Sequence, residues 1–251
     1  MKRIRIRVAY DGTAYTGFQK QGDGTAVQDI LEAAVFAATG ERVRSLGASR
    51  TDAGVHARDN ILVFDSRHPI PADRWSYALN CHLPEDIVVF HSEIVAADHH
   101  PLRQHYKKTY EYHVTQARFP NPLTARYSWW IREVLDVEVM RCAMKKLIGR
   151  HDFEAFRGGT HEYKSTVRTI YTADVSQRGE EIILSVTGDG FLYNMVRIIA
   201  GTVIYAGKGK FGPDRIDEML RTRDRLLSGP TAPACGLVLA RIEETDNPDN
   251  M

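Results

Sequence analysis

The chain has 251 residues, 43% of them hydrophobic and 26% charged, which is typical of a folded protein with one large domain or two ordinary ones. Its 33 Lys and Arg residues nearly balance 32 Asp and Glu residues, so any nucleic-acid partner must be bound by local basic patches. The three cysteines are widely spaced and form no CxxC pair, which argues against a disulfide framework and a structural zinc site.

The N-terminal stretch "MKRIRIRVAYDG" alternates polar and apolar residues and ends in Asp-Gly, which predicts a half-buried strand followed by a turn. It lacks the basic segment and apolar block of a secretory signal. No apolar run in the chain approaches the roughly 20 residues that a membrane-spanning helix needs. We therefore expect a cytoplasmic protein.

The rest of the first half is predicted to contain helices between strands. Thr25 and Gln28 form a capping-box pattern, apolar residues keep helical spacing over 27–38, and Gly40 ends the helix. After a charged loop, "NILVFDS" (60–66) predicts a strand. Pro71 occupies a first helical position ahead of "ADRWSYALNCHL", and "DIVVFHSEIVA" (86–96) predicts another strand.

The second half repeats this alternation. Strands are predicted at 108–116 and, around a Gly-containing turn, within 168–188, with a helix between them at 136–149. A long apolar helix is predicted at 191–207, a further helix opens with Pro213, and "GLVLARIEE" (236–244) predicts a closing strand. We therefore predict an α+β fold with two halves, 1–105 and 106–251.

Four basic clusters could contact RNA or DNA, although such clusters are more often solvated faces. One lies on the polar side of the first strand, at Arg3, Arg5 and Arg7. The others are Arg42 with Arg44, "RQHYKK" at 103–108, and "GKGK" at 207–210.

The loop "GASRTDAGVHARDN" (47–60) crowds ionisable side chains between two apolar runs, with Gly47 and Gly54 as its flexible joints. Loops on a rigid scaffold are where binding and catalytic groups gather, so this loop is a candidate site. An ordinary solvated charged turn is the alternative.

Arg197 stands inside the long apolar helix, where its charge requires a partner. Asp52 is a suitable carboxylate, because a contacting cation would lower its pKa and keep it ionised as a nucleophile or base. Alternatively, Arg197 reaches the surface or caps a backbone carbonyl.

A metal site built from Asp52, His56 and the histidines at 99 and 100 is the competing interpretation of the loop. It is weak, because Gly54 disfavours a helical ligand pair and no second cluster has ligand spacing. The sequence also lacks a Gly-rich phosphate loop and a dinucleotide fingerprint, so we expect no cofactor.

Tyr110 and Tyr112 lie two apart on a predicted strand and hence on one face, beside the basic 103–108 cluster. Aromatic and basic groups together are used to bind unstacked RNA bases. Strand tyrosines are, however, equally common as core residues.

Several segments resemble the bacterial tRNA pseudouridine synthase A family. "SRTDAGVHA" resembles its catalytic loop, "YDGTAYTGFQKQ" its N-terminal signature, and "GDGFLYNMVRIIAGTVI" the motif whose arginine pairs with the catalytic aspartate. "LPEDI", "HDFEAFRG" and "PTAPACGLVL" also resemble family segments in the expected order. Phe18 stands where many members have tryptophan, a departure that does not touch the chemistry.

The resemblance implies roles for four residues. Asp52 would be the catalytic nucleophile, Arg197 its partner, Tyr110 the ring that stacks on the target base, and Arg50 the residue that fills the space left by a flipped nucleotide. Tentative RNA contacts from the basic clusters and matched segments are Arg103, Lys107, Lys108 and Arg157.

The family further implies two RRM-like halves about a central, mostly antiparallel sheet, a homodimer, and isomerisation of uridine to pseudouridine at positions 38, 39 and 40 of the tRNA anticodon stem-loop. An RNA-binding module without catalysis and a metal-dependent hydrolase remain as rival hypotheses. A mere binder has no need for an ionised acid paired with arginine, and chelator sensitivity would identify a hydrolase.

Overall fold

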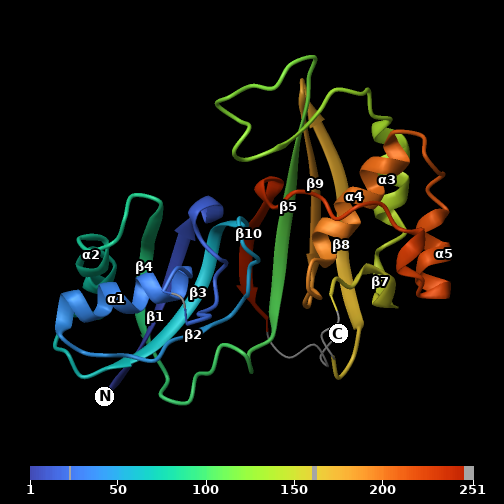
Figure 1. Cartoon of the computed structure of the whole chain (residues 1–251). Helices are drawn as coiled ribbons and strands as arrows, with labels where there is room; N and C mark the ends of the chain where they lie inside the picture. Colours follow the sequence, from blue (N-terminus) through green and yellow to red (C-terminus); the bar gives the residue numbers. More distant parts are fainter. Residues whose placement is uncertain (23, 160–162, 246–251) are drawn as a thin grey trace. The chain divides into compact units, whose positions relative to one another are not determined.

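The computed structural model describes residues 1–22, 24–159 and 163–245. It divides into two compact units (Figure 1). Unit 1 comprises Met1–Tyr106 together with the segment from Leu239 onward, and unit 2 comprises Lys107–Val238. The division lies one residue after the predicted boundary between 105 and 106, and the C-terminal segment, predicted in the second half, belongs to unit 1.

Unit 1 alternates strands and helices in the order β1 (Lys2–Tyr10), α1 (Val27–Thr39), β2 (Leu46–Gly47), β3 (His56–Ser66), α2 (Trp75–Asn80) and β4 (Ile87–Val95). Its strands lie in the order β4-β1-β3, with β2 also pairing with β3 and β10 (Leu237–Glu244) beside β3. The pairs β1–β3, β1–β4 and β2–β3 are antiparallel. This βαββαβ order confirms the RRM-like prediction for unit 1.

The alternation of β1 separates a core face from a polar face. Ile4, Ile6 and Val8 are fully buried. Phe64 lies opposite Ile4 on β3 and meets Trp75 of α2 edge to face, with ring centroids 5.2 Å apart. The helices α1 and α2 pack together, and α2 packs against β4, so they cover this apolar face (Figure 1).

The arginines of the polar face of β1 are paired with carboxylates. Arg3 donates to Asp65 at 2.7 and 2.8 Å, and Arg5 forms ion pairs with Glu93 and Glu244. Arg7 donates to both carboxylate oxygens of Asp59. This cluster is therefore a network of ion pairs that holds β1 to its neighbouring strands, and its charge is largely neutralised.

Unit 2 contains β5 (Tyr106–Gln116), β6 (Trp129–Ile131), α3 (Val137–Lys145), β7 (Gly149–Asp152), β8 (Val167–Arg178), β9 (Glu181–Gly188), α4 (Met195–Gly207) and α5 (Arg215–Thr222). Its strands lie in the order β5-β9-β8-β7 and are antiparallel, while β6 pairs in parallel with β5. The helix α3 packs against both β8 and α4. Both units thus confirm the α+β class.

Helix starts were the least accurate predictions. The predicted capping box of Thr25 and Gln28 is wrong. Ala26 is the N-cap of α1, and no side chain forms a capping hydrogen bond there. The side chain of Gln28 bonds instead to the main chain of Lys20 and Ser45. Gly40 does end α1, with a φ of 74°. Pro71 precedes a short 3-10 turn rather than beginning a helix directly.

The apolar helix α4 begins four residues later than its hydrophobic stretch indicates, at Met195. The short strands β2, β6 and β7 were not predicted, because two to four residues carry no detectable periodicity. Across the described residues, none of the helices is both long and apolar enough to span a membrane.

Candidate active site

The charged loop of unit 1 connects β2 to β3. A turn forms where the backbone N–H of Val55 donates to the carbonyl oxygen of Asp52 at 3.1 Å, and Gly54 supplies the positive φ of 75° that this turn uses. Arg50 is exposed and Asp52 is partly exposed. The turn conformation agrees with the sequence argument against a helical pair of Asp52 and His56.

The segment that follows β1 holds this loop through backbone hydrogen bonds. The N–H of Phe18 donates to the carbonyl oxygen of Thr51 at 3.0 Å, and the N–H of Gly54 donates to that of Tyr15 at 3.4 Å. Two segments more than 30 residues apart in the chain are thereby joined on both sides of Asp52.

Two glycines allow these backbones to approach so closely. A Cβ on Gly12 would lie 2.0 Å from the carbonyl oxygen of Val55, far inside any permitted contact. A Cβ on Gly17, whose φ is 111°, would lie 2.8 Å from the carbonyl oxygen of Thr51. The glycines of "YDGTAYTGFQ" are therefore required by contact with the loop, in addition to any turn that they form.

Buried polar side chains fix the loop from beneath. The hydroxyl groups of Tyr10 and Thr51 lie 2.7 Å apart, and the amide nitrogen of Asn60 donates to Tyr10 at 3.3 Å and to the carbonyl oxygen of Ser49 at 3.0 Å. Because all these groups are buried, each lost partner would leave a costly unsatisfied group. The network makes the position of the loop well defined.

His56 belongs to this supporting structure. It is buried, its Nδ1 accepts the backbone N–H of Gly12 at 3.1 Å, and the same nitrogen lies 3.0 Å from the carboxylate of Asp11. Within the described part of the chain, no group of three His, Cys, Asp or Glu residues is placed to hold a metal ion.

In unit 2, Tyr110 is buried on β5 and meets Phe191 edge to face, with ring centroids 5.1 Å apart. Phe191 is itself partly exposed. Tyr112 is fully buried, its hydroxyl group donates to the carbonyl oxygen of Pro233 at 2.9 Å, and burial raises its pKa. The two tyrosines differ accordingly: Tyr112 is a core residue, whereas Tyr110 lies beside a ring that solvent reaches.

Arg197 lies in the first turn of α4 and is partly exposed. Its Nε donates to the carbonyl oxygen of Ala232 at 2.7 Å and its Nη1 to the side-chain oxygen of Asn194 at 2.9 Å. Asn194 precedes the helix with a φ of 58°. The backbone contact offered as an alternative is therefore present. These bonds fix the direction of the guanidinium group, and its pairing with Asp52 stays a prediction.

The tentative RNA-binding residues differ in how their charges are engaged. Arg103 is exposed in unit 1. In unit 2, the Lys107 ammonium lies 5.0 Å from the centre of the Tyr171 ring, and desolvation lowers the pKa of Lys108 to about 8. Arg157 forms an ion pair with Glu154 at 2.5 Å. Phosphate contact by Arg157 would have to compete with this carboxylate.

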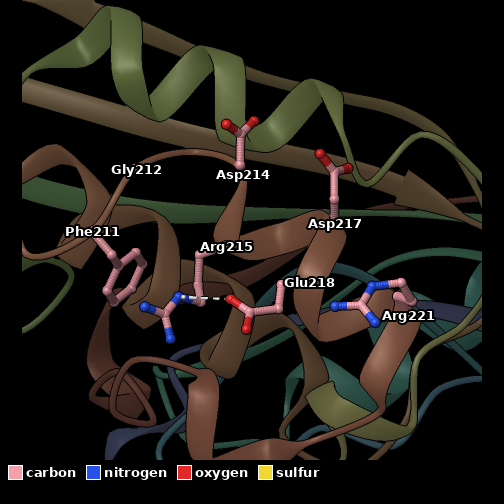
Figure 2. Close-up of a pocket in the computed structure, with 7 residues that line it drawn as sticks. All are labelled: Phe211, Gly212, Asp214, Arg215, Asp217, Glu218 and Arg221. Atoms are coloured by element: carbon pink, nitrogen blue, oxygen red, sulfur yellow. Dashed lines mark ion pairs between the residues drawn. The ribbon is translucent and has the colours of Figure 1, made fainter.

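A surface hollow of about 550 Å³ lies along α5 (Figure 2). Phe211 and Gly212 line it together with charged side chains, among which Arg215 and Glu218 form an ion pair at 3.4 Å. None of the residues that the sequence indicated as catalytic, substrate-binding or RNA-binding lines this hollow.

The residues that position the loop were not predicted from the sequence. Tyr10, Thr51 and Asn60 form its buried network, and Tyr15 donates to Asp86 at 2.5 Å beside it. Only the two glycines within the short stretch 12–17 gave a local signal, because closely spaced glycines often mark a close backbone approach.

Comparison with known proteins gives a match over most of the chain. The family model described as tRNA pseudouridine synthase matches residues 6–105 and 143–243. A tRNA pseudouridine synthase A of Pelobacter propionicus is 41% identical over 242 residues, which cover 96% of this chain and 99% of the relative. A protein of the same name from Brevibacillus brevis is 42% identical with the same coverage.

Proposed function

Because the chain belongs to the tRNA pseudouridine synthase family, we propose that it converts uridine to pseudouridine at positions 38, 39 and 40 of the tRNA anticodon stem-loop, with Asp52 as its catalytic carboxylate. It is an isomerase, since its substrate and product have the same atoms. The observation that carries the proposal is the aspartate loop, held by the N-terminal signature on both sides of Asp52.

The reaction breaks the bond between N1 of the uracil and the ribose, rotates the base and joins its C5 to the same ribose carbon. C5 loses its hydrogen as a proton and N1 gains a proton, so the atoms balance. Neither an oxidant nor a water molecule is consumed, so one positioned carboxylate suffices in principle. Asp52 can attack the ribose, attack the base or remove a sugar proton. A rigid loop suits each of these steps, because reaction requires the attacking oxygen in near-contact geometry.

We assign Arg197 as the cation that keeps Asp52 ionised. Its support is the family resemblance and the two hydrogen bonds that orient its guanidinium group. A partner of this kind lowers the pKa of a carboxyl group and preserves its reactive form.

Substrate binding falls to Arg50 and Tyr110 in this proposal. A uridine paired in a stem must leave the base stack, at a cost of a few kcal/mol. The exposed Arg50, two residues from Asp52, would occupy the vacated space, and Tyr110 would stack on the extruded base. The edge-to-face contact with Phe191 keeps the Tyr110 ring in one orientation.

We further propose a cytoplasmic homodimer that contacts tRNA through Arg103, Lys107, Lys108 and Arg157. These assignments rest on the family resemblance and on the positions of the basic clusters. Of the four, the exposed Arg103 is the best suited to a phosphate contact, because no reorganisation of a buried charge is needed.

The test is Asp52→Asn, which keeps the size of the side chain and removes its charge. Release of tritium from tRNA labelled at C5 of uridine reports each turnover. We expect the rate to fall by several orders of magnitude while the Kd for tRNA changes less than about threefold, because the carboxylate acts beyond the ground state. Asp73→Asn, an exposed carboxylate of the same unit, is the matched control and should keep the parental rate.

Other outcomes would favour the rival functions. An Asp52→Asn protein with the parental rate would exclude this residue as the catalytic carboxylate. If the unaltered protein binds tRNA and releases no tritium, it is an RNA-binding module. If turnover is lost on chelation and restored by metal while the tRNA stays folded, a metal-dependent enzyme is indicated.

A further inference from the structure

The segment 118–128 of unit 2, here called the arm, joins β5 to β6. It projects beyond the end of β5 (Figure 1), and every residue from Arg118 to Tyr127 is exposed. It lies between the two stretches, 6–105 and 143–243, that the family model matches, so the match assigns it no role.

The arm has a defined conformation although its residues from Arg118 to Tyr127 are exposed. The segments on either side of the arm are hydrogen-bonded to each other. The N–H of Ala117 donates to the carbonyl oxygen of Ile131 at 3.2 Å, next to the parallel pairing of β5 with β6. Within the arm, the main-chain and side-chain oxygens of Asn121 accept N–H groups of residues 123–125 at 2.9–3.1 Å. Ser128 anchors its far end by a hydrogen bond to Thr115 at 2.7 Å. The arm is therefore pre-organised.

Large apolar side chains of this ordered arm point into solvent. Phe119 is 69% exposed and Leu123 is 85% exposed. Three arginines, Arg118, Arg126 and Arg132, lie in or next to the arm, against one acidic residue, Glu133, between positions 117 and 134. Exposed aromatic rings interleaved with cations are typical of surfaces that bind single-stranded or unstacked RNA.

A hollow of about 620 Å³ adjoins the arm and is lined by Trp129, Trp130, Ile131, Arg132, Glu133 and Lys208. The indole N–H of Trp130 donates to the carbonyl oxygen of Ala117 at 3.0 Å, which fixes its ring, and the residue is 37% exposed. A flat aromatic ring that lines a hollow beside the exposed Arg132 suits a stacked nucleobase and its phosphate, whereas the other cation of the lining, Lys208, is ion-paired with Glu133 at 2.9 Å.

We propose that the arm and this hollow form a second contact surface for the tRNA substrate, in which an exposed base stacks on Trp130 or Phe119 and Arg118 and Arg132 bind phosphates. This inference rests on the proposed function. Tyr110 on β5 and Ala117 just after its end are seven positions apart, which corresponds to roughly 23 Å of extended strand. The surface therefore contacts nucleotides other than the target uridine and contributes to tRNA affinity, not to the chemical step.

The proposal predicts a binding defect without a chemical defect. In Arg118→Gln/Arg132→Gln, the Kd for full-length tRNA should rise, and the slope of log Kd against log salt should fall by about 1.4–1.8, since each phosphate contact contributes roughly 0.7–0.9. Trp130→Leu should weaken binding by roughly 5- to 150-fold, and Trp130→Phe should retain most of the affinity because a ring remains. Single-turnover rates at saturating enzyme should stay parental in all three variants.

Leu123→Ala is the matched control, because an aliphatic side chain cannot stack on a base. Its Kd for tRNA should be unchanged. The result that would overturn the proposal is an unchanged Kd in the arginine and tryptophan variants. If those variants or Leu123→Ala instead lower the mass of the protein in ultracentrifugation, the arm contacts a second copy of the chain and the RNA assignment is wrong. Because these readouts are binding and mass, they do not depend on whether Asp52 is the catalytic group.

Discussion

Gly12→Ala should disable the charged loop that carries Asp52, although Gly12 lies 40 positions before Asp52 in the chain. The added Cβ would stand 2.0 Å from the carbonyl oxygen of Val55, whereas ordinary contact begins at 3.4 Å, so the two backbones must separate by about 1.4 Å. The N–H of Val55 is bonded to the carbonyl oxygen of Asp52, and the displacement is passed to the carboxylate through this turn. A misplacement of about 1 Å can cost roughly 100-fold in rate.

Unfolding alone would not produce such a loss. Overpacking of this kind costs about 1–3 kcal/mol, and a domain stable by at least about 5 kcal/mol keeps about 2 kcal/mol, which corresponds to roughly 97% folded protein. We therefore expect a single-turnover rate at least about 100-fold below the parental rate in a protein that is folded by circular dichroism at the assay temperature.

The control for this prediction is Gly212→Ala, in the hollow of Figure 2, where an added Cβ meets nothing within 4 Å. This variant should keep both the melting temperature and the rate. If Gly12→Ala also kept the parental rate, the close backbone approach would not be what holds Asp52 in place, and the structural role assigned to the N-terminal signature would be refuted.

Two smaller perturbations test the same unit. Tyr15→Phe removes the donor to Asp86 next to the loop and should lower the free energy of unfolding in urea by about 1 kcal/mol; an unchanged value would mean that this hydrogen bond contributes nothing net. The hydrogen bond from Arg3 lowers the pKa of the Asp65 carboxyl below its ordinary value, so its stabilisation is present above about pH 4 and is lost as the pH falls through the lowered pKa. The free energy of unfolding should therefore fall less between about pH 4 and pH 2 in Asp65→Asn than in the parental protein, and equal falls in the two proteins would contradict this.

Periodicity was enough to predict the elements that carry the core. The alternation of Ile4, Ile6 and Val8 gave β1 and its buried face, and the spacing from Val27 to Ala38 gave α1. Both patterns persist over nine or more residues, so each hydrophobic face is unambiguous. The cap of α1 was mispredicted because Gln28 is recruited by the distant Ser45, which a local rule does not include.

The conformation of the charged loop was predicted in part. The position of the charged loop and its turn followed from local composition, since Gly54 allows the backbone to reverse there. The contacts that anchor the loop could not be predicted from local composition. The contacts to Gly12 and Tyr10 arise only when two distant segments pack together. The roles of Asp52 and Arg197 came from the family resemblance and stay predictions.

The return of the C-terminal strand to unit 1 affects how the protein is made. β10 lies beside β3, the strand that follows the charged loop, and the carbonyl oxygen of Ile242 accepts a hydrogen bond from Arg7 of β1. A ribosome adding about 5–20 residues per second needs roughly 7 to 27 s to go from Tyr106 to Leu239. Throughout that interval the nascent first unit has an unpaired strand edge beside the loop. The unit that carries the proposed catalytic aspartate is thus begun first and completed last during synthesis.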